Sequence, residues 1–139
     1  MTTIEEALEG STPLAEKVRT GGPYRSADEL IARMRAVLPS LTENEKIATL
    51  NAHPRIGEDP GRLSARSLEE QGEDRLPELS RLNAEYEQRF GFRFVVFVNR
   101  RPKSEIVEIL RQRLTRSRAE EMEEGLRAIV DIAADRLRS

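Results

Sequence analysis

The chain has 139 residues, 35% of them charged, and its 23 basic and 25 acidic side chains give a formal net charge of −2. This near balance argues against a protein that binds nucleic acid through a general basic surface. The absence of cysteine excludes disulfides, thiolate nucleophiles and cysteine-bound metals. The length predicts one domain over residues 1–139, able to bury roughly two-thirds of its unfolded surface.

Capping residues and glycines divide the chain into a series of predicted helices. Thr12 followed by Pro13 predicts an N-cap and a first helical position, and Gly21 with Gly22 predicts the end of that helix. Further helix starts are indicated by the capping-box spacing, at Ser26/Glu29, Thr42/Glu45, Ser67/Glu70 and Ser117/Glu120. Apolar residues follow at helical spacing, in the series Leu30, Met34, Val37, Leu38; Leu79, Leu82, Tyr86, Phe90; and Met122, Leu126, Ile129, Ala133. We therefore expect an all-α fold, a single compact multi-helix domain.

Two stretches interrupt the helices. Residues 54–66, with two glycines and Pro60, are predicted to form a loop. Residues 92–98, FRFVVFV, have the propensity of a β-strand, but no second strand is evident to pair with them. We expect this segment to be a buried extended or helix-entry segment whose main-chain N–H and C=O groups could meet a ligand.

No targeting or membrane segment is evident in the sequence. MTTIEEALEG at the N-terminus lacks the basic and apolar regions of a secretory signal. No apolar run approaches the ~20 residues needed to span a bilayer. We expect a soluble, cytoplasmic protein without a membrane partner.

His53, in LNAHPRIG, is the only histidine of the chain and the first candidate for general acid–base chemistry. The alternative is a histidine at a helix C-terminus that interacts with the helix dipole. The proline that follows restricts its backbone, and the predicted loop beside it could form the rim of a pocket. A metal site with Glu58 and Asp59 has too few ligands to be favoured.

The second candidate is SLEEQ, residues 67–71. The spacing of Ser67 and Glu70 is accounted for by a capping box alone. A helix N-terminus can also bind an anion through its N–H groups, Glu70 could orient an imidazole, and Gln71 offers both a donor and an acceptor. Both interpretations stay open on spacing alone. Arg136, in DIAADRL, would by itself be a solvated charge at a helix end.

These stretches, taken in order, resemble the 2-oxo-4-hydroxy-4-carboxy-5-ureidoimidazoline (OHCU) decarboxylase family of urate degradation. EGSTPLAEKV is similar to the family's first block, LNAHPRIG to its His-Pro-x-x-Gly element and SLEEQ to its Ser-x-x-Glu-Gln element. RLNAEYEQRFGFRFVVFV, SEIVEILRQRL and IVDIAADRL resemble its later blocks. The ordered set, spread over most of the chain, is specific where no single motif would be.

The resemblance implies the family's own all-α fold, a homodimer, and a reaction without metal or organic cofactor, in which OHCU loses carbon dioxide to give (S)-allantoin. Carried over by motif, His53 becomes the catalytic acid/base and Glu70 its partner. The remaining matches imply substrate contacts by Pro54, Ser67, Leu68, Glu69, Gln71, Phe94, Val95, Val96, Phe97, Val98 and Arg136. Phe94 to Val98 would act through the main chain, and Arg136 would meet a substrate carbonyl or carboxylate.

Two alternatives remain. A catalytically silent helical interaction module could keep the same fold, although such a protein should have lost His53, Glu70 or Gln71, and all three are present. A decarboxylase acting on a related ureido or imidazoline acid would carry the same residues. The sequence does not separate this second alternative from the OHCU reaction.

Overall fold

The computed structural model describes residues 2–56 and 77–139, and within these ranges the regular structure is helical, with no strand. The N-terminal helices are α1 (Ile4–Ala7), α2 (Pro13–Thr20), α3 (Ala27–Val37), the 3₁₀ turn η1 (Leu38–Ser40) and α4 (Glu43–Asn51). The C-terminal helices are α6 (Pro77–Phe90), α7 (Lys103–Arg113) and α8 (Arg118–Arg138). The predicted all-α class is confirmed.

The helix starts follow the predicted caps. Thr42 and Ser117 each form a complete capping box at the beginning of α4 and α8. At α3 the box is only half formed: the Ser26 hydroxyl accepts from the Glu29 N–H at 3.1 Å, but the Glu29 carboxylate accepts from the N–H of Arg25 instead. Thr12 caps α2 with proline at its first turn, and Gly21 is its C-cap, as the sequence predicts.

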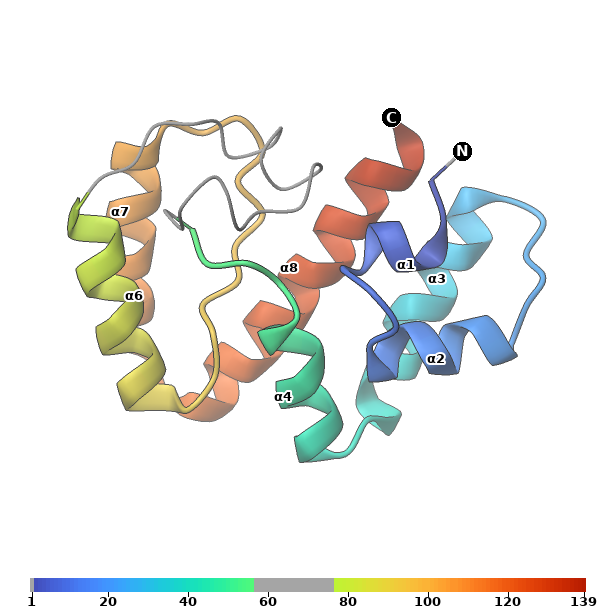
Figure 1. The fold of residues 1–139 in the computed structure, drawn as a ribbon, viewed down its shortest axis with the longest axis horizontal. Helices are drawn as coiled ribbons and strands as arrows, with labels where there is room; N and C mark the ends of the chain where they lie inside the picture. The colour runs from blue at the N-terminus through green and yellow to red at the C-terminus, as the bar shows by residue number, and fades with distance from the viewer. Residues whose placement is uncertain (1, 57–76) are drawn as a thin grey trace.

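The long helix α8 is the centre of the fold. It packs against α1, α3 and α4, while α2 packs on α3 and α4, and α6 pairs with α7 (Figure 1). Its predicted apolar series is buried throughout: Met122, Leu126, Ile129 and Ala133. None of the helices in residues 2–56 and 77–139 combines the length and the apolar character needed to cross a membrane.

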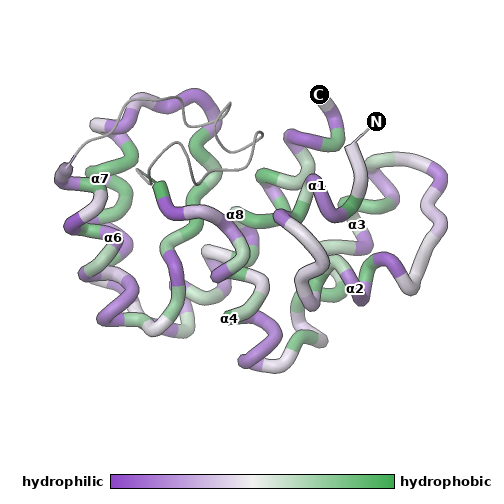
Figure 2. The backbone as a smooth tube through the Cα atoms, in the orientation of Figure 1, coloured by the Kyte–Doolittle hydropathy of each residue, from purple (hydrophilic) through white to green (hydrophobic). Residues whose placement is uncertain are grey.

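The apolar segment after α6 is neither a strand nor a helix. Gly91 ends α6 with a positive φ of 83°, a conformation that side chains disfavour, and its N–H donates to the Glu87 carbonyl at 2.9 Å. Residues 93–98 then run without regular structure alongside α6 and α7 (Figure 1). Figure 2 shows hydrophobic residues along this stretch, in contrast to the alternating pattern of the helices. The interpretation as a buried, unpaired segment is confirmed, and its strand propensity is overridden because the described chain offers no partner strand.

Candidate active site

His53 lies just beyond the end of α4. The helix finishes at Asn51 with Ala52 as its C-cap, and the His53 N–H donates to the Leu50 carbonyl at 3.2 Å. The residue is only 4% exposed. A histidine kept at a helix end for the dipole alone would have no need to leave water, so burial favours the functional interpretation.

The surroundings of the imidazole favour its neutral form. Neither ring nitrogen has a hydrogen-bond partner of good geometry among the described residues. The pKa of His53 is lowered to about 4, chiefly by burial; the positive charge of Arg136 acts in the same direction, whereas the Glu9 carboxylate and the backbone of Thr49 oppose it. At neutral pH the ring is therefore uncharged and able to accept a proton.

Arg136 is buried beside this histidine rather than solvated, so the interpretation of Arg136 as a surface charge is wrong. It is 1% exposed. Its Nη1 lies 3.0 Å from the Glu9 carboxylate and donates to the carbonyls of Glu6 at 3.1 Å and Ala7 at 3.3 Å. The electrostatic influence of both Arg136 and Glu9 on His53 places α8, the end of α1 and the end of α4 around one site.

Glu9 was not predicted from the sequence. It follows α1 with a φ of 62°, a left-handed conformation that is uncommon for a residue with a side chain. Its side chain is 10% exposed and is held against Arg136. Nothing in the sequence around Glu9 predicts this ion pair, because Arg136 is more than a hundred residues away.

The segment of residues 93–98 begins directly beside His53. The Arg93 N–H donates to the Asn51 side-chain oxygen at 2.9 Å, and Arg93 Nη1 donates to the His53 carbonyl at 3.1 Å. Phe94, Val95 and Val96 are buried, and the next two residues are half-buried. The predicted neighbourhood of histidine and apolar segment is therefore present in the structure.

The carbonyl groups of this segment are more engaged than the sequence suggested. Val95 accepts from Arg113 at 3.2 Å, while Phe97 and Val98 accept from the side chain of Arg101. By contrast, no main-chain N–H from Phe94 to Val98 donates to an acceptor within residues 2–56 and 77–139. The N–H groups, rather than these carbonyls, remain as candidate ligand contacts.

Helix α6 fixes the chain that follows His53. Pro54 is half-buried. Arg55 forms a two-pronged ion pair with Glu87, at 2.6 and 3.0 Å, and the Asn83 amide donates to the Ile56 carbonyl at 2.5 Å. The histidine is thus held from both sides, by α4 before it and by α6 after it.

The second predicted element lies outside the described residues. Ser67, Leu68, Glu69, Glu70 and Gln71 all fall between residues 57 and 76. The predicted roles of Glu70 as partner of His53 and of the other four as substrate contacts therefore stay predictions. So does the predicted loop beyond Ile56.

The described part of the site can accept a proton next to a buried ion pair, that of Arg136 with Glu9. A buried neutral imidazole is a competent general base, and a desolvated guanidinium can bind an anionic group. The main-chain N–H groups of residues 94–98, which have no acceptor within residues 2–56 and 77–139, follow Arg93 and its contact with His53, and they add donors for an oxygen-rich ligand. This arrangement suits a small, polar, negatively charged substrate.

Known proteins share this chain's sequence pattern. The sequence model of the OHCU decarboxylase family matches residues 1–138. The OHCU decarboxylase of Haloferax volcanii is 32% identical over 95% of this chain and 83% of its own length. A bifunctional uric acid degradation protein of Bacillus sp. (strain TB-90) is 30% identical over 94% of this chain, which spans only 27% of that protein.

Solved structures share the fold. An OHCU decarboxylase crystallised in the presence of (S)-allantoin superimposes with a TM-score of 0.74, at 24% identity over 96% of this chain and 92% of that one. An (S)-allantoin synthase gives a TM-score of 0.71 at 23% identity, with 97% of this chain matching 47% of that one. The match along the whole sequence, together with the shared fold, shows that this chain belongs to the OHCU decarboxylase family.

Proposed function

We propose that residues 1–139 act as a single domain that decarboxylates OHCU to (S)-allantoin in urate degradation, without metal or organic cofactor. The observation that carries the proposal is the neutral, buried His53 beside Arg136 and the N–H groups of residues 94–98. Family membership supplies the substrate, and the site supplies the groups that its chemistry requires.

The reaction needs one proton to leave the substrate's hydroxyl and another to reach carbon. The bond from the hydroxyl-bearing ring carbon to the carboxylate breaks and carbon dioxide departs. Its electron pair forms a ring double bond as the adjacent imine nitrogen takes up the displaced electrons and a proton. His53 accepts the hydroxyl proton, which gives the carbonyl of the product, and a proton delivered to one face of the ureido-bearing carbon sets the S centre.

The other residues bind and orient the substrate. Arg136 places a desolvated positive charge beside the substrate's carbonyl or carboxylate. The N–H groups of Phe94 to Val98 hold its oxygen atoms, Pro54 lines the site, and Ser67, Leu68, Glu69 and Gln71 complete the contacts. Glu70 orients His53 and favours its protonated form once the proton has been transferred.

Replacement of the histidine tests the mechanism. In His53→Ala we expect folded protein with (S)-allantoin formation reduced by ~10²–10⁴-fold, the usual contribution of general acid–base catalysis. Chiral detection of allantoin from freshly generated OHCU measures the rate, and circular dichroism checks the helices. A folded His53→Ala variant with wild-type activity would remove this residue from the mechanism.

The wild-type protein decides between the proposed function and its alternatives. A catalytically silent module would leave the spontaneous decay of OHCU and its racemic product unchanged. An enzyme for a related ureido or imidazoline acid would decarboxylate that acid faster than OHCU. The family resemblance also supports a homodimer, which light scattering on the purified chain tests.

A further inference from the structure

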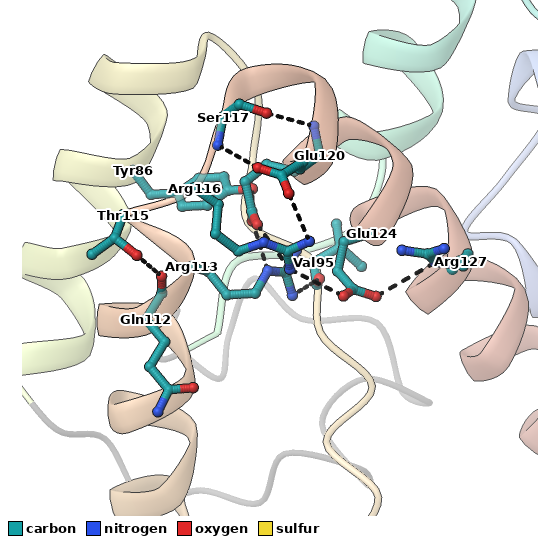
Figure 3. Close-up of polar contacts among 11 residues, drawn as sticks. Tyr86, Val95, Gln112, Arg113, Thr115, Arg116, Ser117, Glu120, Glu124 and Arg127 are labelled. Atoms are coloured by element: carbon teal, nitrogen blue, oxygen red, sulfur yellow. Dashed lines mark hydrogen bonds and ion pairs between the residues drawn. The ribbon is translucent and has the colours of Figure 1, made fainter.

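A charged cluster is buried between α6, α7 and α8. Arg113 of α7 is 6% exposed and Glu121 of α8 is fully buried. The Arg113 Nε lies 2.6 Å from Glu121 Oε1, and the Tyr86 hydroxyl of α6 donates to the same oxygen at 2.7 Å. Figure 3 shows Tyr86, Arg113 and Val95 gathered where the three helices meet.

Stability alone is a weak reason for such a cluster. Removing two charges from water costs several kcal/mol for each ion, and well-packed apolar side chains of similar volume often stabilise a fold equally well. Arg116 adds a second positive charge, with Nη1 3.5 Å from Glu121 Oε2. Burial and the bond to Glu121 raise the pKa of Tyr86, so its hydroxyl stays a neutral donor.

The cluster is joined directly to the apolar segment. Arg113 Nη1 donates to the Val95 carbonyl at 3.2 Å, and its guanidinium lies 4.8 Å from the centre of the Phe94 ring. The Tyr86 ring meets Phe94 edge-on at 5.3 Å. Arg113 therefore holds the side chain of Phe94 and the main chain of the next residue, Val95.

This attachment does what a neighbouring strand would do in a sheet. In a ladder, main-chain hydrogen bonds to the next strand fix the register of an extended segment. Residues 93–98 have no such neighbour in the described chain, and their carbonyls are held by the side chains of Arg113 and Arg101 instead. A shift of the segment would move all of its main-chain N–H groups.

We propose that Arg113 is a positioning residue for the reaction: it fixes the main chain of Phe94 to Val98 so that its N–H groups meet the substrate, and Glu121 and Tyr86 hold its guanidinium in place. The inference rests on the proposed function, because it gives the cluster a role in substrate binding. Arg113 acts through the segment and does not itself touch the substrate.

The first test replaces the arginine by a lysine. Arg113→Lys keeps the charge opposite Glu121, but a single ammonium cannot reach the carboxylate, the Val95 carbonyl and the Phe94 ring together. We expect the KM for OHCU to rise about tenfold, the effect of one lost well-placed hydrogen bond, with kcat changed much less. The pH profile should be unchanged because His53 is untouched.

A triple variant separates positioning from folding. Arg113→Met with Glu121→Leu replaces the ion pair by apolar side chains, and Tyr86→Phe removes the hydroxyl that would otherwise lose its acceptor, so the thermal stability should be retained or increased. We expect the same rise in KM, and faster amide hydrogen exchange at residues 94–98, in a protein that is at least as stable as the wild type. Wild-type KM and exchange in this stable variant would overturn the proposal.

The control lowers stability elsewhere. Val18→Ala removes buried methyl groups from α2, which packs on α1, α3 and α4. It should lower the melting temperature at least as much as Arg113→Lys while leaving the KM unchanged. A rise in KM in Val18→Ala equal to that in Arg113→Lys would show that the Arg113 effect is general destabilisation.

Failure of the proposed function has a different result. If the wild-type protein does not accelerate (S)-allantoin formation, the function is wrong, whatever the variants do. In that case the dissociation constant for (S)-allantoin, measured by calorimetry, and the amide exchange still decide the positioning role. An unchanged dissociation constant together with unchanged exchange in the triple variant would contradict it.

Discussion

The properties of His53 come from where its side chain lies, more than from which residue it is. In water a histidine titrates near pH 6.5, but burial holds the pKa of His53 at about 4. The Arg136 guanidinium, itself buried, acts in the same direction, and the Glu9 carboxylate acts against it. A general base must be unprotonated before it reacts, and this environment keeps His53 in that form at neutral pH.

The lowered pKa predicts a pH-dependent stability. Between about pH 4 and 6.5 the unfolded chain binds a proton at His53 and the folded chain does not, so the free energy of unfolding rises with pH across this range. When the pH falls from 7.5 to 5, we expect His53 to lower the free energy of unfolding by about 2 kcal/mol. Urea denaturation of the wild type and His53→Gln at both pH values measures it. Equal pH dependence in the two proteins would show that His53 titrates normally.

Glu70 is predicted to have two separable roles. At position N3 of the predicted capping box, the Glu70 side chain would accept a main-chain hydrogen bond. A glutamine could also accept it, so Glu70→Gln should cost little stability. As partner of His53 its charge matters, so the same change should lower turnover by about tenfold or more and shift the pH–rate profile to lower pH. Ser67→Ala, in contrast, should cost ~1 kcal/mol of stability. A Glu70→Gln enzyme that is less stable but kinetically normal would identify Glu70 as a cap only.

At the scale of elements, local sequence determines where helices start, and tertiary contacts determine the conformation of the irregular segment. Capping residues define the helix starts because the bonds that they make span only three residues. The segment of residues 93–98 is the opposite case, since its sequence favours a strand and its conformation is decided by side chains from α6, from α7 and from Arg101 just before α7. Strand propensity is a weak preference, and a strand without a partner strand cannot satisfy its main-chain hydrogen bonds.

The cap of α8 offers a test at this scale. The Ser117 hydroxyl accepts from the Glu120 N–H at 3.1 Å, and the Glu120 carboxylate accepts from the Ser117 N–H at 3.1 Å. We expect Ser117→Ala to lower the free energy of unfolding by about 1 kcal/mol, and Ser117→Asp to preserve most of it. Urea denaturation compares them. A loss in Ser117→Asp as large as that in Ser117→Ala would show that the serine acts by packing and not by capping.

At the scale of the molecule, the site depends on how α4 and α8 cross. A Cβ added at Gly125 of α8 would lie 2.7 Å from the Leu50 side chain of α4, closer than atoms normally approach. Leu50 is fully buried, so its side chain has little room to move. Its carbonyl accepts a hydrogen bond from the His53 N–H. The absence of a side chain at Gly125 therefore allows α4, and His53 at its end, to lie close to α8.

Gly125→Ala tests this crossing. An exposed helical glycine gains about 1 kcal/mol on replacement by alanine, whereas overpacking a core costs about 1–3 kcal/mol. We expect a net loss of stability and a fall in activity, because α4 must shift and carries His53 with it. Thermal unfolding and the allantoin assay measure the two effects. A stabilised, fully active Gly125→Ala variant would contradict this account.

The sequence by itself determined the helical class, the described caps, the apolar faces and, through its ordered motifs, the family. The first three depend on residues close together along the chain, and the family depends on the order of motifs spread over most of it. A further pattern was available: Arg136 continues the series of Met122, Leu126, Ile129 and Ala133 at the same spacing. Arg113 likewise continues that of Ile106 and Leu110, so the helical period places both buried arginines on apolar faces.

Only the tertiary structure decided what these buried charges meet. Glu9 and Arg136 are far apart in sequence, and so are His53 and Arg93, yet each pair is in contact. Periodicity gives the face of a helix on which a residue lies, but it says nothing about which distant helix covers that face. The depth of burial and the neighbouring charges set the protonation of His53, and both arise from helix packing, which no local stretch of sequence encodes.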